Sequence, residues 1–261
     1  MSVWPCHTFR FVGGHRYRSQ TATRPFWPNA GEPCIPSVNV GPGPLRLVWS
    51  PTVRRQTVDE RRAEILETTC EVVIERGFAA TRISDVAHKL GVSTGLIHYH
   101  FENKELLLAE AFKFAARQDI DRVAARVGEV PTALAKLDRI FQLWAPEQDD
   151  YAWMLWIDSW GEALRNEAMQ KISQELDIQS KGQLEAIIRE GVVSMEFRCD
   201  DPTGAAWRLS ALADGLAIQM AAHSGIISRA GHRTHLRTAA IAELGLPADA
   251  FVSKASKARR K

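Results

Sequence analysis

The sequence predicts an all-α protein in which three N-terminal helices form a small domain and a larger helical domain follows. From Thr57 onward, apolar residues recur every three to four positions, as they do on one face of an α-helix. No segment alternates between apolar and polar residues in the manner of a half-buried strand. Two short helical patterns flank the tight turn LGVS at residues 90–93 and follow a longer one, which is the order found in a helix-turn-helix.

The first predicted helix lies between a cap at Thr57 or Asp59 and a stop at Gly77. Its apolar face consists of Ile65, Leu66, Thr69, Cys70, Val73 and Ile74. The second carries Ile83, Val86, Ala87 and Leu90 on one face and ends at Gly91.

The third predicted helix starts after Ser93, and the longer fourth helix starts after Asn103, because both side chains can cap a helix. On the third helix, Ile97 and Phe101 are expected to face the core. Helical periodicity then continues over residues 131–144, 149–165, 167–192, 203–222 and 235–244.

Charge is distributed unevenly along the chain, although the formal net charge is only +2. Residues 1–55 carry seven Arg and one acidic residue, and residues 253–261 carry five basic residues. Removing these charges of +6 and +5 leaves −9 for the segment between them, which suits a cationic partner better than an anionic one.

Residues 1–55 contain eight of the twelve prolines and no persistent period, so we expect a disordered Arg/Pro-rich extension. Its three Trp are unusual for a solvated segment. One explanation is a mis-called translation start, with the true start near Val53 or Val58.

The four cysteines, Cys6, Cys34, Cys70 and Cys199, form no C-x-x-C pair, which indicates buried or incidental thiols in a reducing compartment. No apolar run is long enough to span a bilayer, and the N-terminus lacks the apolar stretch of a signal peptide. We therefore expect a cytoplasmic protein that does not enter the membrane.

The stretch TRISDVAHKLGVSTGLIHYHFENKELLLAEAF, residues 81–112, resembles the N-terminal DNA-binding domain of TetR-family transcriptional regulators. The agreement falls at Thr81, Asp85, Val86, Ala87, Gly91, Val92, Ser93, Gly95, Ile97, Tyr99, His100, Phe101, Lys104 and Leu107. The departure is His98, where the family usually has Tyr, and this difference is expected to alter operator preference and not the fold. Residues 151–170 and 205–221 are similar to the C-terminal domain of the BetI-like branch.

The composition of the two ends of the chain and this resemblance together give four expected segments. They are a disordered extension (1–55), a TetR-type helix-turn-helix DNA-binding domain (56–116), a helical effector-binding and dimerisation domain (117–245) and a basic C-terminal tail (246–261).

The resemblance also implies which residues meet a double-stranded DNA operator. Thr94, Gly95 and His98 would lie at the major groove, and Tyr99 and His100 would contact phosphates. Flanking contacts would come from Lys104, from Arg82 and Ser84 at the front of the second helix, from Ser93, and from Arg54 and Arg55 in a basic arm. For Tyr99 the alternative is packing against the first helix, and for Lys104 it is a merely solvated charge. His98 and His100 are two residues apart on a helix and diverge by about 200°, so a shared metal ion is disfavoured.

The predicted helix over residues 149–165 places Trp153, Trp156 and Trp160 on one face. An aromatic pocket near carboxylates could bind a quaternary ammonium or a polyamine by cation–π attraction. The candidate ligand residues are Trp153, Trp156, Trp160, Asp158, Met154, Trp207 and His223. Asp158 lies roughly opposite the Trp stripe, however, and the alternative is that these Trp are simply core.

Homodimerisation is implied through helices near 170–192 and 203–222. The face formed by Leu209, Leu212, Leu216 and Met220, with the small Ala213 and Gly215 nearby, suits close helix packing. The same face could equally belong to the core of one chain.

The sequence leaves three classes of function to consider. The first is an effector-responsive homodimeric repressor of the bacterial nucleoid, in which a small effector moves the fourth helix and respaces two DNA-binding heads on a palindromic operator. The second is a helical dimerisation protein without specific DNA binding. The third is an enzyme using His98 or His100 as general base, but no paired carboxylate, nucleophile motif or phosphate loop accompanies them. We therefore expect a regulator that is not an enzyme and needs no cofactor or metal.

Overall fold

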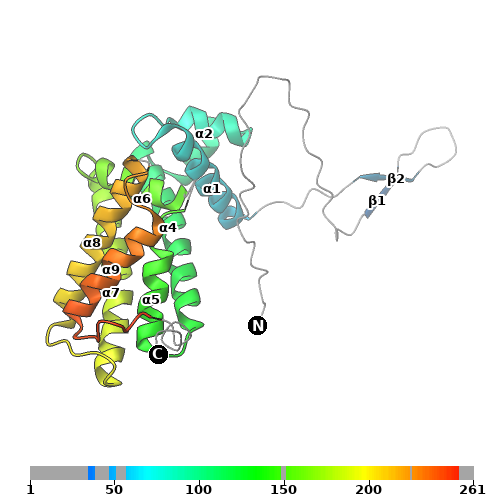
Figure 1. The fold of residues 1–261 in the computed structure, drawn as a ribbon. Helices are drawn as coiled ribbons and strands as arrows, with labels where there is room; N and C mark the ends of the chain where they lie inside the picture. The colour runs from blue at the N-terminus through cyan, green and yellow to red at the C-terminus, as the bar shows by residue number, and fades with distance from the viewer. Residues whose placement is uncertain (1–34, 39–46, 51–56, 148–150, 224, 253–261) are drawn as a thin grey trace. The chain divides into compact units, whose positions relative to one another are not determined.

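The structure is a computed structural model that describes residues 35–38, 47–50, 57–147, 151–223 and 225–252 (Figure 1). The chain divides into two compact units, Met1–Arg55 and Gln56–Lys261. In the first unit, β1 (Ile35–Val38) and β2 (Leu47–Ser50) pair in antiparallel register, with Ile35 opposite Ser50. The sequence alone does not indicate these two strands, because they are too short to show alternation. The rest of that extension, and the basic residues 253–261, lie outside the described residues.

The described part of the second unit is entirely helical, as predicted. Its helices are α1 (Val58–Arg76), α2 (Ile83–Leu90), α3 (Thr94–His100), α4 (Lys104–Gly128), α5 (Ala133–Leu143), α6 (Tyr151–Ala163), α7 (Glu167–Val193), α8 (Pro202–Ala222) and α9 (Arg229–Glu243). In Figure 1, α1 and α2 lie at one end of the unit, and α4 runs from that end down into a bundle with α5, α7, α8 and α9.

The helix boundaries follow from local capping chemistry. Thr57 and Glu60 form a reciprocal capping box at the start of α1, and Gly77 ends the helix with a φ of 79° that favours glycine. Asn103 caps α4 by accepting a hydrogen bond from the Leu106 amide at 2.8 Å. These helix ends agree with the predicted ends because the capping residues that determine each end lie within four residues of it.

Two predicted boundaries differ from the structure. Helix α9 begins at Arg229 and not near residue 235, because Ser228 caps it. The apolar pattern does not reveal this first part of the helix, because its buried position is occupied by the polar residue His232. Leu246 is buried and Phe251 packs against the bundle core, so the stretch predicted as a basic tail belongs to the fold as far as it is described. Helix α4 crosses the expected boundary at residues 116 and 117 without a break.

Three apolar clusters hold the second unit together. The first joins α1, α2, α3 and the start of α4 around Ile65, Ile97 and Phe101, so this head has its own core. The second lies at the junction of the head with α4, α6 and α7, and includes Phe78 and Trp156. The third fills the bundle of α4, α5, α7, α8 and α9. The head is therefore continuous with the bundle through packed side chains.

The cysteines that the structure describes are not exposed. Burial raises the pKa of the Cys70 thiol to about 12, and its Sγ lies 3.2 Å from the carbonyl oxygen of Ala111. Cys199 is half-buried and free, whereas Cys6 and Cys34 lie outside the described residues.

The described helices include none with the length and apolar character needed to cross a bilayer.

Candidate functional site

The turn between α2 and α3 has the geometry of a helix-turn-helix. Gly91 ends α2 in the left-handed region, with a φ of 73°, where a side chain would be strained. The amide of Val92 then donates to the Ala87 carbonyl at 3.0 Å. The hydroxyl of Ser93 caps α3 by accepting from the Leu96 amide at 3.3 Å. The turn thereby orients α3 so that one of its faces packs on the head and the opposite face is exposed to solvent.

Helix α3 separates its inner and outer side chains clearly. Ile97 and Phe101 are buried in the head core, as predicted. On the outer side, Thr94, Gly95 and His98 are exposed. Tyr99 is 73% exposed, so it does not pack against α1, and its ring meets the half-buried His100 ring edge-on at 5.1 Å. The helix thus presents a small, polar and aromatic surface with no acidic residue in it.

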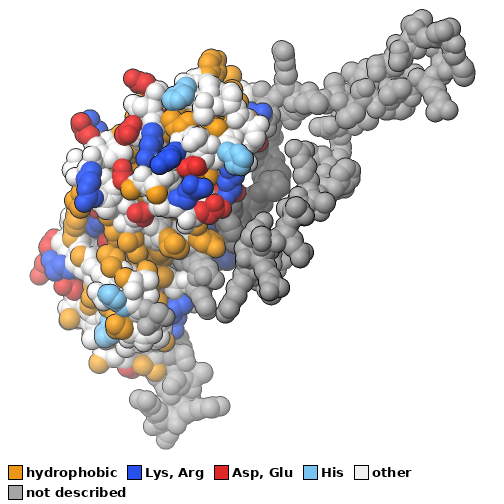
Figure 2. Space-filling view, turned by 90° about the horizontal axis from the view of Figure 1, so that it is seen from above, with side chains coloured by type: hydrophobic (Ala, Val, Ile, Leu, Met, Phe, Trp, Pro, Cys, Tyr) orange, Lys and Arg blue, Asp and Glu red, His pale blue; other side chains and the backbone are white. Residues whose placement is uncertain are grey.

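The flanking candidates surround this surface. Arg82 and Ser84 are exposed at the N-terminal end of α2, and Lys104 begins α4 with its Nζ donating to the Ala79 carbonyl at 3.1 Å. Arg54 and Arg55 lie outside the described residues. Viewed from the head end, Lys and Arg side chains are interspersed with Asp and Glu (Figure 2), so this face is not a continuous basic patch. Across the described residues, no group of three His, Cys, Asp or Glu side chains could hold a metal ion.

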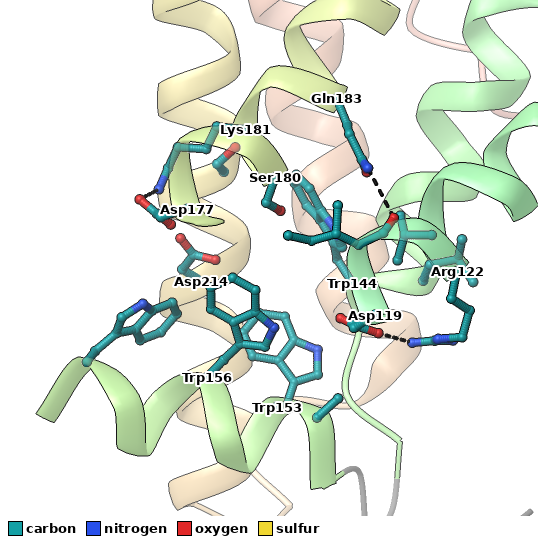
Figure 3. A pocket seen from close by; sticks show the side chains of 16 residues that line it. Asp119, Arg122, Trp144, Trp153, Trp156, Asp177, Ser180, Lys181, Gln183 and Asp214 are labelled. Carbon is teal, nitrogen blue, oxygen red and sulfur yellow. Dashed lines mark hydrogen bonds and ion pairs between the residues drawn. The ribbon is translucent and has the colours of Figure 1, made fainter. Parts of the chain in front are cut away.

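A small cavity, partly open to solvent, lies in the bundle between α4, α6, α7 and α8. Four Trp line it, namely Trp144, Trp153, Trp156 and Trp160. Figure 3 shows Trp153 and Trp156 projecting from α6 into this space. Trp156 and Trp160 have ring centroids 6.3 Å apart, tilted by 50°, and Trp156 also packs edge-on against Phe112 at 5.1 Å. The cavity therefore has a firmly packed aromatic wall.

Three carboxylates also line the cavity, and two of them are paired. Asp119 accepts from Arg122 at 2.5 Å, and Asp177 forms an ion pair with Lys181. Lys181 is further held over the Trp207 ring, 4.6 Å from its centroid. Asp214, on α8, has no ion pair or hydrogen bond from its side chain among the described residues, and it lies near the Asp177–Lys181 pair (Figure 3). The lining thus carries one uncompensated negative charge.

The environment of Asp214 disfavours its charged form. Burial, the largest cause, raises the pKa of this carboxyl from 3.8 to about 6; Lys181 opposes the shift and Asp177 adds to it. A carboxylate held at this cost inside an aromatic cavity is a site at which a cation would be stabilised.

The structure brings together only part of the predicted ligand set. Trp153, Trp156 and Trp160 line the cavity, whereas Asp158, Met154, Trp207 and His223 do not. Asp158 accepts a hydrogen bond from the Phe78 amide at 2.9 Å instead, because it is two residues from Trp156 and points the opposite way from α6. Met154 and Trp207 are on the surface, and His223 is exposed at the end of α8.

Sequence reasoning missed the lining residues that come from other helices, namely Trp144, Asp119, Asp177, Lys181, Ser210 and Asp214. For Asp214 a signal exists, since it is the only acidic residue within α8, an otherwise mostly apolar helix. A lone carboxylate in such a helix is costly to bury unless a group of opposite charge pairs with it.

The predicted dimerisation face on α8 is also revised. Leu209 and Ala213 are buried in the core of the single chain, and Leu212 and Leu216 pack against that core. The exposed side of α8 carries Trp207, Ala211 and Gly215 at four-residue spacing, and the neighbouring α7 exposes Ile178 and Gly182. The alternative of intramolecular core therefore applies to the leucine face, and a row of small and apolar side chains faces outward instead.

Comparisons with known proteins agree with this architecture. Residues 65–111 match the family model of bacterial regulatory proteins of the tetR family, and residues 133–245 match that of the BetI-type transcriptional repressor C-terminal domain. The crystal structure of a transcriptional regulator from Saccharomonospora viridis in complex with choline is 32% identical, covers 70% of this chain and 96% of that one, and has a TM-score of 0.63.

Two curated relatives are similar over different lengths. The HTH-type transcriptional regulator BetI of Escherichia coli K12 is 25% identical over 166 residues, which are 62% of this chain and 82% of that protein. The fatty acid metabolism regulator protein of Bacillus subtilis is 35% identical over 74 residues, which are 28% of this chain and 38% of that protein.

An exposed helix-turn-helix joined by a long helix to an aromatic cavity defines the class of DNA-binding transcriptional regulators. The chain belongs to the TetR family of these regulators and has a BetI-type C-terminal domain. It is a DNA-binding transcriptional repressor.

Proposed function

We propose that this repressor is a homodimer that leaves a palindromic operator when a small organic monocation of the quaternary ammonium class fills the α4–α6–α7–α8 cavity. Residues 56–116 form its DNA-binding domain, residues 117–245 its effector-binding and dimerisation domain, and it acts at the nucleoid in the bacterial cytoplasm. The observation that carries the proposal is the cavity itself, which is lined by four Trp and by the unpaired carboxylate of Asp214.

The charge balance favours a monocation over a polyamine. Asp119 and Asp177 already have basic partners, so only Asp214 remains to neutralise a ligand. A cation with a methyl-covered surface loses little hydration on entering, and the faces of Trp rings attract it. The choline complex of the Saccharomonospora viridis relative supports the same ligand class.

The first test compares choline with its neutral carbon isostere, 3,3-dimethylbutan-1-ol, by calorimetric titration. Because the two differ in charge and hardly in shape, we expect choline to bind at least about 30-fold more tightly, as about 2 kcal/mol of desolvated cation–π attraction implies. Choline should also weaken binding to an operator selected from random duplex DNA. Equal affinity for both molecules, or no binding of either, would contradict the proposal.

Tyr99→Ala is expected to weaken operator binding by about 30-fold, because each of the two subunits loses one side-chain hydrogen bond to a phosphate worth about 1 kcal/mol. The thermal unfolding midpoint should stay unchanged, since the side chain is 73% exposed. Fluorescence anisotropy at physiological salt measures the affinity. Tyr99→Phe, which keeps the ring and removes the hydroxyl, serves as the matched variant and should account for most of the loss. An unaltered affinity in both variants would remove Tyr99 from the interface.

Gly215→Arg is expected to convert the homodimer into a monomer by placing a long charged side chain on the exposed face of α8. Within the chain, no atom lies within 4 Å of the position that a Cβ would take at this glycine, so the fold itself accommodates the change. Gly161→Arg on α6 is the matched control, because this glycine is also helical and has the same open space. Light scattering coupled to gel filtration reports the mass. A Gly215→Arg protein that remains dimeric would place the interface elsewhere.

A further inference from the structure

The outer face of α3 offers few groups that can recognise a base. Helix α3, TGLIHYH, contains no Arg, Lys, Asn, Gln, Asp or Glu, the side chains that most often pair with base edges in the major groove. Its exposed polar side chains are Thr94, His98 and Tyr99. Because a recognition helix contacts the bases through its N-terminal part, sequence recognition by α3 depends mainly on Thr94 and His98.

His98 is placed to reach the same part of the groove as the first turn of α3. It follows Thr94 by four residues and Gly95 by three, so its Cβ lies about 5–6 Å from that of Thr94. A helical side chain covers the turn that precedes its own Cα, which for His98 is the turn at Gly95. Gly95 has no side chain, and a Cβ added there would contact the Ser93 hydroxyl, at 3.7 Å. The imidazole therefore extends over an open part of the surface.

The imidazole of His98 is not engaged within the protein. Among the described residues it forms no hydrogen bond, ion pair or ring contact. The two rings that follow it differ, because Tyr99 and His100 meet edge-on at 5.1 Å and His100 also lies 6.4 Å from Phe101. Both ring nitrogens of His98 are therefore available to DNA.

The chemistry of an exposed imidazole favours guanine among the four bases. Phosphates make the groove electrically negative, which favours a ring nitrogen that carries a proton over one that does not. Guanine offers that N–H two adjacent acceptors, N7 and O6, whereas adenine has an amino donor beside its N7. Cytosine offers an amino donor, and thymine offers one acceptor beside a methyl group. The Thr94 hydroxyl both donates and accepts, so it distinguishes the bases less well than His98 does.

We propose that His98 recognises a guanine of the operator, with an imidazole N–H that donates to N7 or O6 of the base. This assigns a base preference to the position at which the chain departs from the pattern of its family. Because each α3 reads its own stretch of DNA, the role of His98 depends neither on the effector site nor on the homodimer proposed above. A contact of His98 with a phosphate would instead strengthen binding to every sequence equally.

The test begins with selection of bound duplexes from random DNA by the full chain at physiological salt. We expect the selected sequence to contain a guanine that His98→Ala no longer selects, while the other preferred bases are kept. Changing this G·C pair to A·T should weaken binding about fivefold for the unaltered protein, as the loss of one hydrogen bond implies, and less than twofold for His98→Ala. His98→Gln should no longer prefer guanine to adenine, because an amide pairs with N6 and N7 of adenine. Fluorescence anisotropy measures these affinities.

Tyr99→Ala is the matched control, because Tyr99 is exposed on the same helix and is expected to contact a phosphate. It should bind every sequence more weakly and keep the preference for guanine. His98→Ala should unfold at the temperature of the unaltered protein, since the His98 side chain is exposed. A guanine preference that survives in His98→Ala would overturn the proposal, and so would equal weakening of every sequence. For the unaltered protein, a selected sequence without guanine, or no selected sequence at all, would overturn it without any variant.

Discussion

Asp214→Asn is expected to lower the affinity for choline by about 30-fold or more. The substitution keeps the shape of the side chain and removes the one uncompensated charge of the cavity. A unit charge about 5 Å from a cation at an effective dielectric constant of 20 contributes about 3 kcal/mol, part of which is offset by desolvation. Calorimetric titration at pH 7.5 measures the change. Asp119→Asn is the matched control, since that carboxylate is already paired with Arg122 and should alter the affinity much less.

The same variant is expected to be more stable than the unaltered protein without ligand. The pKa of Asp214 is about 6 in the folded chain and 3.8 when unperturbed, so the folded state holds this proton more tightly than the unfolded state does. Stability is therefore lost as pH rises from about 4 to about 6, and the loss is complete above that range. With about 1.4 kcal/mol per pKa unit, the lost stability is about 3 kcal/mol.

Thermal unfolding of Asp214→Asn should therefore show a gain over the unaltered protein at pH 7.5 that disappears near pH 4. Choline should raise the unfolding temperature of the unaltered protein more at pH 7.5 than at pH 5, because binding requires the ionised carboxylate. A destabilised Asp214→Asn protein at pH 7.5 would mean that the carboxylate has a structural partner, and would remove the reason to regard it as a ligand site.

The head could be predicted from sequence because its determinants are local. Thr57, Ser93 and Asn103 cap helices through the amides of residues three positions later, and Gly91 ends α2 by its own backbone conformation. Ile97 and Phe101 were recognisable as inward residues from helical spacing alone. Nothing in these features depends on contacts with distant parts of the chain.

The cavity could be predicted only in part, because its lining comes from helices distant in sequence. Helical spacing grouped Trp153, Trp156 and Trp160 on one face of α6, and the structure places that face at the cavity. Spacing cannot show which other helix supplies the facing carboxylate, so Asp158, nearest along the chain, was assigned in place of Asp214. For the leucine face of α8, spacing leaves the dimer interface and the core of one chain as alternatives, because intramolecular and intermolecular packing have the same periodicity.

Helix α6 connects the cavity to the DNA-binding head in two ways. On one face, Trp156 packs edge-on against Phe112 at 5.1 Å, and Phe112 packs edge-on against Phe78 at 6.3 Å, in the loop between α1 and α2. On the other face, the Asp158 carboxylate accepts the hydrogen bond of the Phe78 amide. A ligand that displaces the Trp side chains of the cavity wall therefore displaces α6. Helix α6 is hydrogen-bonded to the main chain of the head at the Phe78 amide. This gives the coupling of the two sites a physical connection.

Asp158→Ala is expected to uncouple the effector from the operator. In the unaltered protein we expect choline to weaken operator binding by tenfold or more, within the usual range for allosteric coupling. Without the Asp158 carboxylate, the shift of α6 is no longer transmitted to the Phe78 amide, and the effect of choline should fall to about threefold or less. Choline affinity itself should stay within about twofold, because Asp158 does not line the cavity.

Two further variants separate coupling from general damage to α6. Asp158→Asn should retain most of the response, because its amide oxygen can still accept the hydrogen bond from Phe78. Glu162→Gln, one turn further along α6, should behave as the unaltered protein does, since its carboxylate contacts Asn166 and not the head. Operator affinity measured with and without saturating choline gives the coupling directly for each variant. If Asp158→Ala responds to choline as fully as Glu162→Gln, the signal passes through the aromatic contacts of Phe112, because those contacts remain the connection between α6 and the head.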